Sequence, residues 1–197
     1  SIFYSNGKWH IKVGAYVTPT ETITNDDLRG SITIQTRQSG ADQFNAVKGI
    51  FVAPENNWQP TDFPEVTSST FESEDGGDRK YVDLTLPYTT SVASAQRLAK
   101  QVLYRAREQI TITLPCKMTA FQYEVGDTVM VTNERFGWDQ KVFEVLSWTF
   151  AFDGQEMGVD MVLKETSALI YAWDEEVDEK QFTFNNTNLP NAFDILR

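Results

Sequence analysis

The second half of the chain contains three apolar runs, Phe121-Gln-Tyr-Glu-Val-Gly-Asp-Thr-Val-Met-Val131, Lys141-Val-Phe-Glu-Val-Leu-Ser-Trp-Thr-Phe-Ala-Phe152 and Met157-Gly-Val-Asp-Met-Val-Leu163. Turn-forming residues separate the runs, because Phe136-Gly-Trp-Asp139 follows the first and Asp153-Gly154 follows the second. This pattern is typical of antiparallel strands joined by tight turns. It predicts a β-meander, which we expect to close into a barrel.

The composition indicates a folded acidic protein. A chain of 197 residues with 41% apolar and 13% aromatic side chains can bury a sizeable core, as one large or two small domains. Its 17 Lys and Arg residues against 28 Asp and Glu residues give a formal net charge of −11. This charge repels nucleic acid and anionic lipid, so specific DNA binding is disfavoured.

The single cysteine excludes a disulfide within the chain. Cys116 ends an alternating apolar pattern that includes Ile110, Ile112 and Leu114. We predict a strand here with a buried, structural thiol, because no pair of a histidine and an acid is present to activate it. A fold without cross-links is compatible with assembly in a reducing cytoplasm.

No targeting or membrane segment is predicted. No apolar run approaches the ~20 residues that cross a bilayer, and the first residues lack a secretion signal. The chain starts at Ser1 and strand-like sequence follows almost at once, so we expect a fragment of a longer protein.

Alternating side chains predict further strands in the first half of the chain. Trp9, Ile11 and Val13 alternate with polar residues, which predicts a strand with this face buried. His10 is then expected to point to solvent. Similar patterns predict strands at residues 32–35, 44–52 and 81–86.

Two loops are predicted beside these strands. Residues 54–64 contain three prolines, which exclude a helix or a central strand and predict a long ordered loop. Trp58 and Phe63 anchor this loop to the body, or Trp58 instead stacks against a sugar or another subunit. Residues 72–78 hold four acids around two glycines, but they lack the order of a calcium loop and are predicted to form a solvated hairpin tip.

One amphipathic helix is predicted at residues 90–109. Its apolar residues recur at three- and four-residue steps, and they are Ala95, Leu98, Ala99, Val102, Leu103 and Ala106. A Ser or Thr among residues 89–91 is expected to cap its start. Four cations make it the one basic element of the chain, namely Arg97, Lys100, Arg105 and Arg107. We expect one of two roles for these cations. Either they form a solvated face whose positive charge is favourable near the negative C-terminal end of the helix, or they contact an acidic surface of a neighbouring subunit.

The end of the chain changes in composition. Residues 174–179 contain five acids, and residues 181–191 are rich in Asn and Thr without periodicity. Such a segment is typical of a linker, so we expect the folded body to end near Trp173. The predicted division is an N-terminal β segment at 1–53, a β-barrel domain at 54–173, and an acidic, Asn-rich linker at 174–197 toward a further domain.

No residues are assigned to catalysis, to a cofactor or to a metal. His10 is the only histidine, which excludes a multi-histidine metal site and leaves any Ser-His-Asp arrangement dependent on one residue. The sequence has no phosphate-binding glycine loop and no nucleophile elbow. Paired carboxylates for sugar hydrolysis stay open, because 28 acids allow many pairs. We expect the protein not to be an enzyme.

Several separated motifs in one order carry a resemblance that covers residues 7–173. They are Gly7-Lys-Trp-His-Ile-Lys-Val-Gly-Ala-Tyr16, Asn45-Ala-Val-Lys-Gly-Ile-Phe-Val52, Pro54-Glu-Asn-Asn-Trp-Gln-Pro60, Ala95-Gln-Arg-Leu-Ala-Lys100, Leu114-Pro-Cys-Lys117, Val125-Gly-Asp-Thr-Val129 and Thr132-Asn-Glu-Arg-Phe-Gly-Trp138. The chain thereby resembles the central hub region of the lambda-type phage tail tip attachment protein J, within the family of phage tail hub or central tail fibre proteins.

The resemblance implies a mainly β (α+β) fold, with antiparallel tail-tube-like β-barrel hub domains. It implies a structural protein of a phage or prophage tail tip, which adapts the tail tube to the central fibre and the host-attachment parts. The implied partners are two further copies in a homotrimer and other tail tip and tail tube proteins, with DNA passing through the lumen without specific binding. The implied location is the virion, after assembly in the bacterial cytoplasm.

Two other classes of function stay open. One is a carbohydrate-binding β-sandwich, in which Trp58, Trp138 and Trp173 form a row of stacking platforms. The other is a tail-associated cell-wall hydrolase that uses a pair of acids.

Overall fold

The computed structural model describes residues 2–5, 7–11, 14–36, 43–152, 154 and 156–183. Contacts divide the chain into two compact units: unit 1 is Ser1–Gln43 with Tyr104–Ala172, and unit 2 is Phe44–Leu103 with Trp173–Arg197. This division differs from the predicted domains at 1–53, 54–173 and 174–197, which stay a prediction. Val13, Asp153 and the Asn-rich residues 184–191 lie outside the described residues.

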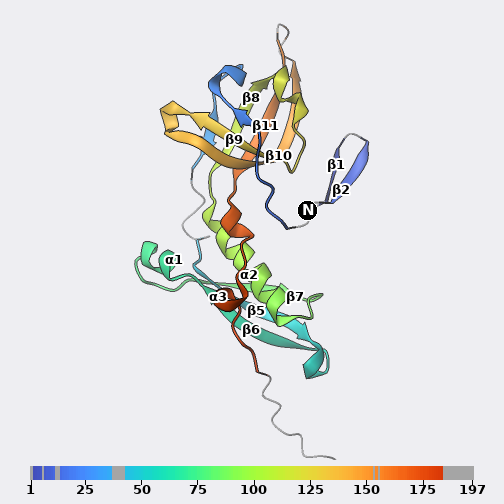
Figure 1. Cartoon of the computed structure of the whole chain (residues 1–197), viewed down its shortest axis with the longest axis vertical. Helices are drawn as coiled ribbons and strands as arrows, with labels where there is room; N and C mark the ends of the chain where they lie inside the picture. Colours follow the sequence, from blue (N-terminus) through green and yellow to red (C-terminus); the bar gives the residue numbers. More distant parts are fainter. Residues whose placement is uncertain are drawn as a thin grey trace, which may run out of the picture. The chain divides into compact units, whose positions relative to one another are not determined.

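Unit 1 contains a mixed six-stranded sheet (Figure 1). Its spatial order is β3 (Thr22–Ile23), β9 (Thr128–Asn133), β10 (Trp138–Phe152), β11 (Met157–Glu165), β8 (Thr111–Lys117) and β4 (Thr33–Gln35). All neighbours are antiparallel except β3 and β9. The predicted meander is confirmed, since β9, β10 and β11 pair in sequence order through tight connections.

The sheet of unit 1 is open, so the predicted closed barrel is not confirmed. In the part of the chain that the structure describes, β3 pairs only with β9 and β4 pairs only with β8. A barrel requires the first strand to pair back with the last along a shared register. The two edge strands are too short for this, because β3 has two residues and β4 has three.

The core of unit 1 lies on one face of this sheet. Alternate residues of the central strands are buried there, and they are Ile112, Leu114, Cys116, Val129, Val131, Phe143, Val145, Val159, Met161 and Leu163. A β-bulge in β10 between Val145 and Ser147 changes which residues face the core. Before the bulge the core-facing residues of β10 are odd-numbered, as Phe143 and Val145 are. After the bulge they are even-numbered, because Trp148 lies opposite buried Met161.

Cys116 is buried in this core, as the sequence predicts. Burial, together with the negative charges of Asp27 and Asp160, raises the pKa of its thiol to about 12. The folded state therefore holds the thiol proton more tightly than the unfolded chain does.

We expect the Cys116 thiol to resist labelling by a disulfide-exchange reagent at pH 8 in the native protein and to react at once in denaturant. Because its pKa is raised on folding, its contribution to stability is complete below about pH 9 and is lost as the pH rises towards 12. Spectrophotometric thiol titration checks the first outcome. Native labelling as fast as in denaturant would show that Cys116 is accessible.

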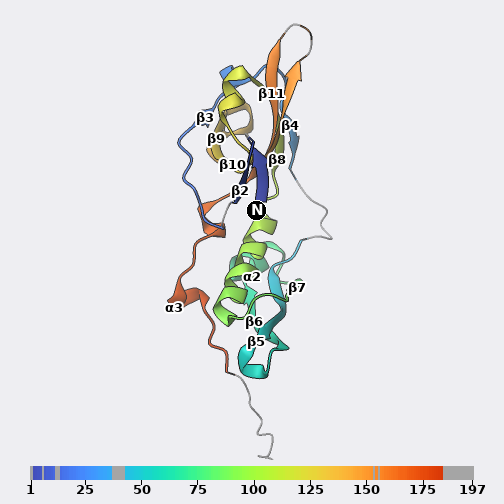
Figure 2. The same cartoon turned by 90° about the vertical axis from the view of Figure 1, so that its right-hand side faces the viewer.

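Unit 2 contains a three-stranded sheet with the long helix beside it (Figure 2). The sheet order is β6 (Gln59–Thr67), β5 (Ala46–Ala53) and β7 (Tyr81–Leu86), with β5 antiparallel to β6 and parallel to β7. The helices are α1 (Ser69–Glu74), α2 (Val92–Arg107) and α3 (Glu175–Asp178). None of the helices within the described ranges has both the length and the apolar character that a membrane crossing requires.

The predicted helix at 90–109 is confirmed as α2. Ala95, Ala99 and Leu103 are fully buried, as the apolar stripe requires. The Ser91 hydroxyl accepts a hydrogen bond from the amide of Ser94 at 3.4 Å, which supplies the predicted cap.

Two loop predictions are wrong in unit 2. Residues 54–64 were predicted to be a loop, but only Pro54–Asn56 form a 3-10 turn and β6 begins at Gln59. Pro60 and Pro64 are tolerated because β6 is an edge strand, where a missing amide need not break a ladder. The predicted hairpin tip at 72–78 begins inside α1, which Ser68 caps by accepting a hydrogen bond from the amide of Phe71.

The remaining elements belong to unit 1. The hairpin of β1 (Ile2–Ser5) and β2 (Lys8–Ile11) forms a separate two-stranded sheet. Short 3-10 turns are formed by Asn25–Asp27, Met118–Gln122, Glu134–Phe136 and Ala168–Ile170. The predicted burial of the first strand is wrong, because Trp9 is 74% and Ile11 is 73% exposed while His10 is half-buried.

Gly49 in β5 marks a close approach of two strands. It pairs with Leu84 of β7, and an added Cβ would collide with the backbone carbonyl of Leu84. We expect Gly49→Ala to lower the free energy of unfolding by about 3 kcal/mol or more, because backbone must shift to relieve the overlap. Urea unfolding followed by circular dichroism measures this. Lys48→Ala, at an exposed neighbour on the same strand, is the control and should change stability by less than about 0.5 kcal/mol.

Candidate interaction surfaces

Residues 173–183, here called the C-terminal strap, pack against α2 within unit 2. The side chain of Gln96 is fully buried and forms two hydrogen bonds with the backbone of Lys180. Its amide group donates to the Lys180 carbonyl at 3.0 Å and its oxygen accepts from the Lys180 amide at 2.9 Å. This reciprocal pair satisfies a buried polar group and holds the strap on the helix.

Charged and aromatic contacts extend the same attachment. Lys100 of α2 forms an ion pair with Asp178 at 2.6 Å, and both side chains are mostly buried. The charged groups of Arg97 and Lys100 lie 5.2 and 5.9 Å from the ring centre of Trp173, within the range of cation–π attraction. Within the segment predicted as an acidic linker, residues 175–178 form the short helix α3, which Asp174 caps, and Asp178 pairs with Lys100 of α2.

Trp58 is the most prominent aromatic group in the turn between β5 and β6. Asn57 and Trp58 have φ values of 53° and 61°, so two successive residues take the left-handed conformation. Phe63 is buried and anchors β6, as predicted, whereas Trp58 is 65% exposed and does not anchor the segment. The exposed indole is available to a partner.

The row of three aromatic platforms considered for a carbohydrate-binding module is not formed. Trp138 is half-buried and packs against Phe136 and Phe143, with ring centres 5.1 and 5.5 Å away. Trp173 is half-buried beneath the cations of α2. Of the three tryptophans, only Trp58 presents its ring to solvent.

The acidic segment before β7 is held by specific contacts. The fully buried side-chain amide of Asn45 donates to the carboxylate of Asp75 at 2.9 Å and to the carbonyl of Asp78 at 2.8 Å. Arg79 pairs with Glu72 and, at 3.1 Å, with Glu65. In the described ranges, no three His, Cys, Asp or Glu residues come together as a metal site.

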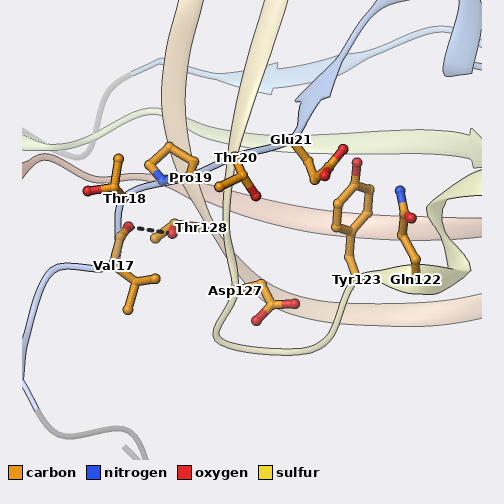
Figure 3. A pocket seen from close by; sticks show the side chains of 9 residues that line it. All are labelled: Val17, Thr18, Pro19, Thr20, Glu21, Gln122, Tyr123, Asp127 and Thr128. Atoms are coloured by element: carbon orange, nitrogen blue, oxygen red, sulfur yellow. Dashed lines mark hydrogen bonds between the residues drawn. The ribbon is translucent and has the colours of Figure 1, made fainter.

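A groove of about 300 Å³ in unit 1 lies between the chain before β3 and the turn before β9 (Figure 3). Its lining consists of Val17, Thr18, Pro19, Thr20, Glu21, Gln122, Tyr123, Asp127 and Thr128. The Thr128 hydroxyl donates to the Val17 carbonyl at 2.6 Å, and the Asp127 carboxylate accepts from the Glu124 amide at 2.8 Å. Burial raises the pKa of Tyr123 above its ordinary value. The lining provides neither a base beside a nucleophile nor a cation for a phosphate.

Apolar side chains also lie at the outer end of the β10–β11 hairpin. Phe150 pairs with buried Val159 and Phe152 pairs with Met157, so the face that forms the core continues outward. Phe152 is 66% exposed and Met157 is 51% exposed. We call Phe150, Phe152 and Met157 the hairpin-tip patch. Its exposure was not predicted, because the alternation that marks these residues is the same as in the buried part of the strands.

Comparison with known proteins identifies the family. Residues 4–148 match the family described as putative phage tail protein. Because the match covers well over half of the chain, the chain belongs to this family of phage tail proteins. Its location is therefore the tail of the virion.

Individual relatives agree with this assignment. The chain is 27% identical over 173 residues to the baseplate hub protein pb3 of Escherichia phage T5, which covers 88% of this chain and 18% of that protein. Its fold resembles a chain in the virion of a native gene transfer agent particle, with a TM-score of 0.62 and 16% identity over 87% of this chain and 36% of that one. It also resembles the tail protein from Neisseria meningitidis MC58, with a TM-score of 0.52 and 17% identity over 79% of this chain and 47% of that one.

The chain spans less than half the length of each of these relatives. What is shown is therefore a fold and a family shared with one part of larger tail proteins.

We expect Gln96→Ala to release the C-terminal strap, because the amide and carbonyl of Lys180 lose their partners. The loss of two hydrogen bonds of about 1 kcal/mol each corresponds to a roughly 30-fold larger equilibrium constant for opening of the strap. Hydrogen exchange of the amides of residues 173–183, read by mass spectrometry, measures this. Gln101→Ala on the same helix is the matched control and should leave the exchange unchanged. Equal exchange in both variants would contradict the role of Gln96.

Proposed function

We propose that the chain is a hub segment of a phage tail tip, which adapts the tail tube to the central fibre and the host-attachment parts. The observation that carries this proposal is the alignment of 88% of the chain with a baseplate hub protein. Because the chain corresponds to 18% of that protein, the proposal concerns one part of the hub and not the choice of host receptor.

The segment acts within a homotrimer and contacts other tail tip and tail tube proteins. The resemblance to the hub region of the lambda-type tail tip attachment protein J supports this assembly, and a tail-tube-like origin of unit 1 belongs to the same proposal. The exposed hairpin-tip patch of Phe150, Phe152 and Met157 also supports it, because a soluble monomer rarely exposes clustered apolar surface without a partner.

The charge of the chain suits a conduit for DNA. A net charge of −11 repels the phosphate backbone, so DNA passes a wall of such subunits without being retained. We propose that the acids are enriched on the side that faces the lumen. A basic lining of the channel in an assembled tip would contradict this.

A carbohydrate-binding role is the second candidate, and the exposure of Trp58 is the one observation that favours it. A single exposed indole is a weak platform compared with a row of stacking rings. Binding to a glycan array that is lost in Trp58→Ala would favour this role over a purely structural one.

We expect Trp58→Ala to weaken trimer formation, because a large exposed indole that becomes buried between subunits contributes about 2 kcal/mol or more to association. This corresponds to roughly a 30-fold higher dissociation constant. Light scattering coupled to size exclusion over a concentration series measures the change. Tyr88→Ala removes an aromatic side chain that is 97% exposed in the same unit and serves as the control. An unchanged trimer in Trp58→Ala would remove this residue from the interface.

A further inference from the structure

The β1–β2 hairpin presents a continuous apolar face. In its register Ile2 pairs with Ile11 and Tyr4 pairs with Trp9, so these four side chains lie on one side of the hairpin. All four are exposed, and the rings of Tyr4 and Trp9 touch edge to face with centres 5.3 Å apart. We call these four residues the hairpin face.

This face lacks the cover that its structure requires. Among the described residues, β1 and β2 pair only with each other. A two-stranded hairpin is at best marginally stable alone in water, and it needs a third strand or a packing surface on its apolar side. The alternation of Trp9 and Ile11 is that of a buried strand, yet both remain exposed in the single chain. The sequence pattern and the exposure together indicate that this face needs a cover that the described residues do not supply.

The charge of the segment around the hairpin face indicates what kind of surface covers it. Residues 1–20 contain two lysines, Lys8 and Lys12, and no acid, in a chain whose net charge is −11. Residues 142–163, which include the hairpin-tip patch, contain four acids and no Lys or Arg, and one of these acids, Asp160, is paired with Arg29. The two segments are therefore opposite in charge, and each carries exposed aromatic and aliphatic side chains. Opposite charge steers two surfaces together, and apolar contact then holds them.

Besides exposed apolar side chains, the hairpin-tip patch has an unpaired strand edge to which a further strand can bind. In β10 the pairing with β9 ends at Glu144, and from Ser147 to Phe152 the described residues of β10 pair only with β11. Long, apolar edge segments of this kind associate with further strands unless they are covered. A neighbouring hairpin therefore meets both an exposed apolar face and an unpaired strand edge.

We propose that the hairpin face of one copy of this chain docks on the hairpin-tip patch of a second copy. The donor residues are Ile2, Tyr4, Trp9 and Ile11, and the acceptor residues are Phe150, Phe152 and Met157. Because donor and acceptor are different surfaces, the contact is head to tail, and repeated contacts close into a ring where the rotation allows it. The inference deepens the proposed homotrimer by naming the surfaces that join its subunits, and in that respect it rests on the proposed function.

The test is disulfide trapping in the full chain with the double variant Trp9→Cys/Phe152→Cys. The control is Trp9→Cys/Tyr88→Cys, in which position 88 is highly exposed but lies outside both surfaces. Cys116 is retained in both, since its buried thiol is protected. After mild oxidation, denaturing gels without reductant separate oligomers linked between chains from monomers linked within a chain. Mass spectrometry of the peptides identifies the joined positions.

We expect a ladder of oligomers joined through positions 9 and 152, with a yield about tenfold or more above that of the control, because docking raises the local thiol concentration. The yield should fall as salt is raised, since opposite charges steer the contact. A bond between these positions within one chain would overturn the proposal, because the same chain would then cover its own hairpin. A yield no higher than the control would also overturn it.

Light scattering of the unmodified chain separates this inference from the proposed function. A trimer that shows no trapping above control contradicts the docking surfaces and leaves the hub proposal in place. Trapping between chains of an otherwise monomeric protein supports the docking surfaces and contradicts a stable homotrimer of this chain alone.

Discussion

The sheet of unit 1 depends on one constraint, which is that alternate side chains of its four central strands must reach the same apolar core. Fully buried residues such as Leu114, Phe143 and Met161 meet this constraint in strands that are far apart in the chain. The bulge after Val145 lets β10 continue past the core while still pairing with β11. The same register that builds the core therefore carries Phe152 and Met157 outward, where the core no longer covers them.

Unit 2 achieves order with a smaller sheet and with buried polar groups whose partners are complete. Gln96 and Asn45 are both fully buried, and each forms hydrogen bonds with backbone from a distant part of the chain. Such groups cost free energy when one partner is removed, so they specify one arrangement more strongly than apolar contacts do. The acidic strap and the basic helix are thereby joined inside one unit, where Arg97 and Lys100 of α2 contact the strap.

Membership of a phage tail protein family offers one explanation for the exposed apolar surfaces of this chain. Proteins of a phage tail act through contacts with neighbours, and this chain has several exposed apolar side chains that a single copy leaves uncovered. Trp58, the hairpin face and the hairpin-tip patch are separate surfaces, so they can serve different contacts. The net charge of −11 opposes binding of the chain to DNA, whereas residues 1–20, with two lysines and no acid, are suited to contact an acidic surface of a neighbouring subunit.

The meander, helix α2 and the buried Cys116 follow from the sequence alone, because side-chain periodicity is a local property of each strand or helix. Periodicity does not say what covers an apolar face, so Trp9 and Ile11 were expected inside and lie outside. Prolines exclude a central strand but not an edge strand, and only the sheet order showed that β6 is an edge. The acidic run is typical of a linker in sequence, and the contacts of Asp178 with Lys100 and of Lys180 with Gln96 do not follow from that pattern, because partners distant in sequence are set by tertiary structure alone.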